Sequence, residues 1–109
     1  MQDLKTEEKY VFTVTKYSKI IVDVYTSFCV PCKVLAPQLE KLSEDYKDVH
    51  FFKINAENNE FLMNGEQGLK KEITSVPTIL SIYEGKEIER VEGANFGAVK
   101  KMVERLERL

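Results

Sequence analysis

The chain of 109 residues contains only two cysteines, Cys29 and Cys32, and two residues separate them. Thiols at this spacing can bind a metal, form a structural disulfide or carry out thiol–disulfide exchange. A structural zinc site usually needs four Cys or His ligands, and the chain adds a single histidine, His50. A disulfide that closes so short a loop stabilises a fold by only about 2 kcal/mol. Exchange is therefore the favoured use, with no metal expected.

The position of the two cysteines also favours exchange. The apolar run at residues 20–25 predicts a strand buried on both faces, and the turn after it leads into a helix. Cys29 then lies at the N-terminus of that helix, where unpaired N–H groups and the helix dipole lower the pKa of a thiol. We expect Cys29 to be the exposed attacking thiol and Cys32 to be the buried resolving thiol.

An aspartate lies in the middle of the predicted strand. Asp23 shares a strand face with Ile21 and Tyr25, so we expect it to be buried, and burial raises the pKa of a carboxyl group. It should lie below the start of the helix, near the inner sulfur. There it can accept the proton that Cys32 loses when that thiol attacks. A hydrogen-bonded structural aspartate is the alternative.

Helices and further strands must hold these residues together. The helix after the cysteines is predicted by apolar residues at helical spacing, namely Leu35, Leu39, Leu42 and Tyr46. Residues 49–54 predict a second strand. Gly65 and Gly68 are expected to divide residues 57–72 into short helical pieces.

The two ends of the chain complete the pattern. Residues 78–83 and 87–91 predict a β-hairpin, and Asn95 is a plausible N-cap for a last helix. Residues 6–17 favour a first helix over a strand. This alternation predicts an α/β fold with helices on both faces of a sheet and a site at the carboxyl ends of parallel strands.

Composition and charge exclude several classes of protein. The chain is 43% hydrophobic and 31% charged, with a net charge of −2, which suits one domain over residues 1–109. The absence of a basic block argues against nucleic acid, and no apolar run could cross a membrane. The N-terminus is polar and lacks the features of a signal peptide. We therefore expect a cytoplasmic protein, where disulfides made for structure alone are uncommon.

The segment VDVYTSFCVPCKVLAPQL resembles the active-site segment of the thioredoxin family, usually V-D-F-W/Y-A-x-W-C-G-P-C-K-x-x-x-P. The positions in register are Asp23, Tyr25, Cys29, Pro31, Cys32, Lys33 and Pro37. FFKIN resembles the strand that carries a buried lysine near the aspartate, which makes Lys53 its counterpart. SVPTIL resembles the loop whose cis-proline faces the cysteines, which makes Pro77 that residue. Gly85 and Gly93 match the family's hairpin glycine and the glycine before its last helix.

The resemblance implies a thioredoxin fold, with a central mixed sheet of four or five strands, helices on both faces and a very short or absent first strand in QDLK. It implies a monomeric thiol–disulfide oxidoreductase that uses a redox disulfide between Cys29 and Cys32 and no cofactor. Its partners would be disulfide-containing client proteins and a thioredoxin reductase. A binding module with an idle dithiol, or a more oxidising oxidase or isomerase, is the alternative.

The resemblance also assigns supporting residues and shows departures. Phe28, Val30, Val76 and Gly93 would line the surface that contacts clients, and Pro31, Lys53 and Pro77 would support the cysteines. Val30 replaces the usual Gly and Phe28 the usual Trp, while an acidic Glu92 precedes Gly93. The stretch between Lys53 and Pro77 is a few residues longer than usual. Bulk at Val30 should alter the redox poise and the choice of partner.

Overall fold

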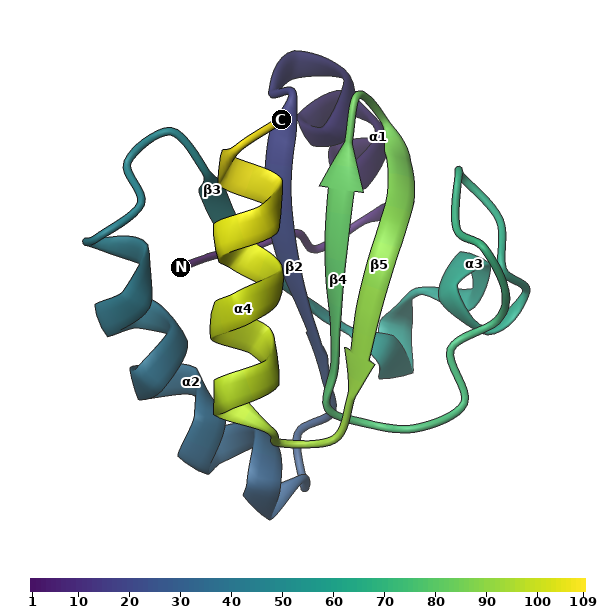
Figure 1. The fold of residues 1–109 in the computed structure, drawn as a ribbon. Helices are drawn as coiled ribbons and strands as arrows, with labels where there is room; N and C mark the ends of the chain where they lie inside the picture. The colour runs from purple at the N-terminus through teal and green to yellow at the C-terminus, as the bar shows by residue number, and fades with distance from the viewer.

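The apolar runs form the inner strands of a mixed sheet. In the computed structural model, which describes all 109 residues, β2 (Lys19–Tyr25) lies between β3 (His50–Asn55) and β4 (Thr78–Tyr83). The edge strands are β1 (Gln2–Asp3), which is parallel to β3, and β5 (Lys86–Glu92), which is antiparallel to β4. β2 is parallel to β3 and antiparallel to β4 (Figure 1). The mixed sheet with its short first strand is thus confirmed.

Helices cover both faces of this sheet. They are α1 (Glu7–Lys16), α2 (Val30–Ser43), the one-turn 3₁₀ helix η1 (Ala56–Asn58), α3 (Glu60–Met63) and α4 (Phe96–Glu107). In Figure 1, α2 and α4 lie side by side across one face, and α1 lies behind the sheet. Side-chain caps begin the longer helices, with Thr6 before α1 and Asn95 before α4, because an oxygen there accepts an otherwise unpaired N–H group. The expected first helix and the Asn95 cap are both confirmed.

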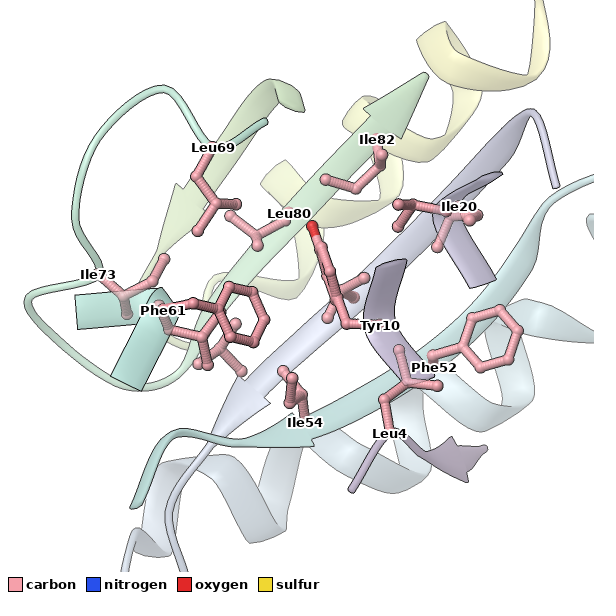
Figure 2. Packing of buried hydrophobic residues seen from close by; sticks show 14 of the residues in the cluster. Leu4, Tyr10, Ile20, Phe52, Ile54, Phe61, Leu69, Ile73, Leu80 and Ile82 are labelled. Atoms are coloured by element: carbon pink, nitrogen blue, oxygen red, sulfur yellow. The ribbon is translucent and has the colours of Figure 1, made fainter. Parts of the chain in front are cut away.

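The larger apolar cluster packs α1 and α3 against the sheet (Figure 2). Tyr10 of α1 and Phe61 of α3 are fully buried, and their ring centroids lie 4.9 Å apart. They contact residues of one face of β2, β3 and β4, such as Val22, Ile54 and Leu80. Burial of this kind, and not helix propensity, stabilises an element as short as α3.

A second cluster packs α2 and α4 on the opposite face. Ile21, Phe51 and Ile79 from three strands meet Leu39 of α2 and Val103 of α4. Successive residues of a strand point to opposite faces, so the unbroken apolar runs supply both clusters. The sheet is therefore packed on both faces, and the carboxyl ends of β2 and β3 lie beside the start of α2.

Three details differ from the sequence predictions. α2 ends at Ser43, so Tyr46 follows the helix, although its ring still packs against the second cluster. Residues 57–72 contain only α3 and part of η1, because the backbone takes positive φ values at Gly65, Gln67 and Gly68. β5 is slightly longer than predicted. None of the helices combines the length and the apolar character needed to cross a lipid bilayer.

Candidate active site

Cys29 is the N-cap residue of α2. Its backbone is extended, with φ −86° and ψ 105°, and the Cys32 N–H donates to Cys29 Sγ at 3.1 Å. Pro31 lies in the first turn of the helix, where a residue without an N–H group leaves no hydrogen bond unmade. The local sequence thus directs a backbone donor at the outer sulfur. In a reduced protein, that donor and the helix dipole favour the thiolate form of Cys29.

The two cysteines form a disulfide in this structure, with 5.2 Å between their Cα atoms. The exposed fraction of Cys29 is 9% and that of Cys32 is 3%. The expected contrast between an exposed and a buried cysteine is therefore small, since Cys29 Sγ lies against the first turn of α2. Its neighbours Phe28 and Val30 are 89% and 67% exposed. Exposed apolar side chains thus flank Cys29 in the sequence.

Asp23 lies beneath the disulfide on the α2 side of the sheet. It is buried, and its Oδ1 atom has no hydrogen-bond partner. It lines a cavity of about 150 Å³ whose walls are Asp23, Tyr25, Thr26, Ser27, Cys32, Lys33, Ala36 and Lys53. Burial raises the pKa of Asp23 to about 7, although the nearby Lys53 ammonium opposes this shift. The structure thus brings Asp23 and Cys32 to one cavity, as the sequence predicted.

Lys53 faces the same cavity from the neighbouring strand. It is the register partner of Asp23 in the parallel pair β2–β3, so the two side chains lie on one face of the sheet. The Lys53 Nζ atom lies 5.5 Å from the centroid of the Tyr25 ring, within the range of a cation–π contact. No carboxylate lies within ion-pair distance of Lys53. Its charge therefore acts on Asp23 across the cavity and not through a direct contact.

The loop before β4 reaches the same end of the sheet. The Val76–Pro77 peptide bond is cis, as the resemblance implied. Thr78, the next residue, is the register partner of Val24, which places this loop beside the carboxyl end of β2. The Gly93 N–H donates to the Pro77 carbonyl oxygen at 2.8 Å, and Gly93 has a φ of 96°, which favours glycine. Val76 is half-buried against the larger cluster.

Three features of this region were not predicted from the sequence. Val34 is 62% exposed and follows Val30 by one helical turn, so it extends the apolar surface beside Phe28 along α2. Val34 lies outside the buried stripe of α2, which contains Leu35 and Leu39, and this position could have indicated from the sequence that Val34 is exposed. The Glu57 carboxylate accepts the Ser27 N–H at 2.7 Å and so holds the turn before Cys29.

The third feature is a hydrogen bond from the Tyr25 hydroxyl to Asp3 Oδ2, at 2.6 Å. Asp3 belongs to β1, and nothing in the local sequence pattern indicated that it reaches this site. Burial raises the pKa of Tyr25 to about 12, and the hydrogen bond to the Asp3 carboxylate adds to this shift. Tyr25 therefore remains a hydrogen-bond donor throughout the neutral range.

The sequence and the fold of this chain are similar to those of thioredoxins. The family model described as "Thioredoxin" matches residues 2–105. Thioredoxin-1 of Saccharomyces cerevisiae is 33% identical over 99 residues, which cover 91% of each chain. The structure of Plasmodium falciparum thioredoxin is similar, with a TM-score of 0.86, 26% identity and coverage of 96% of this chain and 98% of that chain.

A further similar structure was solved to explain the thiol-resolving mechanism of yeast mitochondrial 1-Cys peroxiredoxin via glutathione and thioredoxin systems. It has a TM-score of 0.85 and 26% identity, and covers 97% of this chain and 95% of that chain. The yeast thioredoxin-1 sequence and both solved structures match nearly the whole length of this chain. The pair of cysteines at the N-terminus of α2 lies within the matched residues.

Proposed function

The chain belongs to the thioredoxin family of protein disulfide oxidoreductases, and on that basis we propose that Cys29 and Cys32 are the dithiol through which it reduces client disulfides. The observation that carries this proposal is the N-cap position of Cys29, whose sulfur accepts a helix N–H group. A thiolate is the nucleophile in disulfide exchange, so stabilisation of the thiolate at this sulfur selects it as the attacking group.

The reaction proceeds in two displacements. The Cys29 thiolate attacks one sulfur of a client disulfide, a mixed disulfide forms, and the other client sulfur leaves as a thiolate. Cys32 then loses its proton and attacks Cys29 Sγ, so the Cys29–Cys32 disulfide forms and the second client sulfur leaves. Two electrons pass to the client, and the oxidised product has the disulfide seen in this structure.

Asp23 is proposed as the acceptor of the Cys32 proton. Both residues line the same cavity, and burial raises the pKa of Asp23 to about 7, so its carboxylate and carboxyl forms are both populated at neutral pH. Lys53 faces this cavity and favours the charged form of Asp23, which returns the carboxyl group to the acceptor state after each cycle.

The client would bind over the apolar side chains beside the disulfide. Phe28, Val30 and Val34 are exposed there, and apolar surface of this kind favours protein contacts. We place another border of this surface at Gly93, whose N–H donates to the buried Pro77 carbonyl oxygen, and exposed Glu92 would make that border acidic. Val30 and Glu92 are therefore the proposed determinants of client and reductase preference.

The proposed partners follow from the family. A thioredoxin reductase would return the disulfide to the dithiol, and clients would be proteins that hold an accessible disulfide. The similar structure that concerns thiol resolution in a yeast peroxiredoxin via thioredoxin systems supports a client of this kind. We propose a monomer made of one domain, residues 1–109, that needs no cofactor or metal and works in a reducing compartment such as the cytoplasm.

Insulin reduction by dithiothreitol tests this function. The wild type should accelerate precipitation of reduced insulin, Cys29→Ser should abolish the acceleration, and Cys32→Ser should accumulate a mixed disulfide that non-reducing electrophoresis resolves. Unchanged turnover in Cys29→Ser would refute the assignment. A wild type that binds clients without turnover would indicate a binding module, and a redox potential well above that of thioredoxins, about −270 mV, would indicate an oxidase or isomerase.

A further inference from the structure

Three charged residues form a row across neighbouring strands beneath the disulfide. Lys53 of β3 is the register partner of Asp23 on β2 and of Asp3 on β1. Register partners point to the same face of a sheet, so Lys53 lies between two carboxyl groups. The proposed proton transfer uses Asp23 and Lys53 only, which leaves the Asp3 carboxylate without an assigned role.

Tyr25 links the two ends of this row. Its hydroxyl group donates to Asp3 Oδ2 at 2.6 Å, and its ring lines the cavity shared by Asp23 and Cys32. The Lys53 Nζ atom lies 5.5 Å from the centroid of the same ring. Asp3 therefore holds in place the Tyr25 ring that the Lys53 ammonium group contacts. The remaining Asp3 oxygen, Oδ1, is buried without a partner, as is Asp23 Oδ1.

The N-terminal strand is held firmly in this position. The Leu4 N–H donates to the Lys53 carbonyl oxygen at 2.7 Å, and Leu4 is fully buried in the larger cluster. The ammonium group of Met1 forms an ion pair with Glu40 of α2, and the N-terminus is marked beside α2 in Figure 1. A carboxylate held so close to Lys53 competes with Asp23 for that cation.

We propose that Asp3 is a positioning residue of the active site, whose carboxylate shares the Lys53 ammonium with Asp23 and, through Tyr25, holds that ammonium away from direct contact with Asp23. This inference rests on the proposed function, because Asp23 is assigned there as the proton acceptor for Cys32. Asp3 weakens the electrostatic attraction between the Lys53 ammonium group and the Asp23 carboxylate. Asp23 can therefore take up a proton near neutral pH.

Several other charged or titratable groups line the cavity of Asp23 or act on Lys53 and Tyr25, and they must be counted in the titration of Asp23. They are Tyr25 on its own strand, Lys53 on β3, Asp3 on β1, Cys32, Lys33 and Glu40 on α2, the N-terminal ammonium group, and Glu57 on η1. In the oxidised protein Cys32 does not titrate, and the pKa of Tyr25 is raised to about 12. A titration from pH 4 to pH 9 therefore follows Asp23 without a change in either residue.

Two substitutions should move the Asp23 titration in opposite directions. Asp3→Asn removes the competing charge, so Lys53 turns toward Asp23 and the Asp23 midpoint falls by about 0.5–1 pH unit. Tyr25→Phe removes the hydroxyl group but keeps the Asp3 charge, which then draws Lys53 further from Asp23, so the midpoint rises. The carboxyl ¹³C shift of Asp23 in the oxidised protein measures both, and circular dichroism checks that each variant is folded.

Asp48→Asn is the matched control, because it removes the same charge from an exposed position before β3. The proposal is supported if the Asp23 midpoint falls more in Asp3→Asn than in the Asp48→Asn control and rises in Tyr25→Phe. A midpoint in Asp3→Asn equal to that of the control, or a fall in both variants, overturns it. Failure of the proposed function is a separate result, since it would appear as a wild type that does not reduce insulin.

Discussion

Asp23 places an ionisable group in the interior of the sheet, and its cost to the fold depends on pH. Because the pKa of Asp23 is raised to about 7 in the folded protein, the folded state holds a proton there that the unfolded chain releases near pH 4. Stability must therefore fall as pH rises from about 4 to 7, and remain low above that range. If Asp23 had no role in proton transfer, it could be replaced by an uncharged residue without loss of function.

Asp23→Asn should remove this pH dependence. We expect the oxidised variant to be more stable than the oxidised wild type by an amount of the order of 2–4 kcal/mol at pH 8, and by much less at pH 4. Urea unfolding of both proteins across this range measures the difference. Parallel stability curves for the two proteins would show that Asp23 is not buried as a carboxylate at high pH.

Sequence reasoning identified residues whose neighbours are local and missed those whose neighbours are distant. Cys29 and Cys32 could be assigned to a helix N-terminus because the preceding strand and the following apolar repeat lie beside them in the chain. Asp3 could not be assigned, because its contact with Tyr25 depends on the register of a two-residue strand. Glu57 was missed for the same reason, since its partner Ser27 lies in a different loop.

At the scale of elements, the long segment of residues 64–75 is fixed to the edge strand β5 by hydrogen bonds with an ion pair that lies within that strand, Glu87–Arg90. Glu87 is buried, contacts Arg90 Nε at 2.6 Å and accepts the Lys70 N–H at 2.9 Å. Arg90 in turn donates to the carbonyl oxygens of Lys71 and Glu72. The segment thus covers part of an edge that would otherwise expose unpaired backbone groups.

Glu87→Ala should therefore cost about 3 kcal/mol or more, because it leaves the Arg90 guanidinium half-buried without its partner. Amide hydrogen exchange within residues 64–75 should accelerate in the same variant. Glu89→Ala is the matched control, since its bond to Arg105 joins side chains that are 35% and 54% exposed and should contribute less than about 1 kcal/mol. Equal losses of stability in the two variants would show that Glu87 does not anchor the segment.

The course of residues 64–75 could not be predicted from the sequence, whereas most helices and strands could. Strands β2, β3 and β4 and helix α4 follow from apolar periodicity, because each buries a continuous face. The irregular path through Gly65, Gln67 and Gly68 has no such period, and its course depends on contacts with β5. Only the places where the segment breaks could be inferred from its glycines.

At the scale of the whole molecule, one sheet is shared by two apolar clusters. Residues on alternate sides of the same strands belong to the two clusters, as Ile21 and Val22 do, so neither side can lose its packing without disturbing the other. The proposed single domain should consequently unfold in one step, with an enthalpy of about 70–80 kcal/mol near 60 °C. Calorimetry measures this, and two separate transitions would contradict it.

At the same scale, the sheet and α2 together place Cys29 at a helix N-terminus, and we propose that this position makes a substantial fraction of the reduced Cys29 a thiolate at neutral pH. The most direct test is the rate of alkylation of the reduced protein by iodoacetamide from pH 5 to pH 10, with the modified cysteine identified by mass spectrometry. We predict that Cys29 reacts first, with a midpoint at least about one pH unit below the 8.5 of a free thiol. A midpoint at that free-thiol value, or a faster reaction at Cys32, would contradict the account.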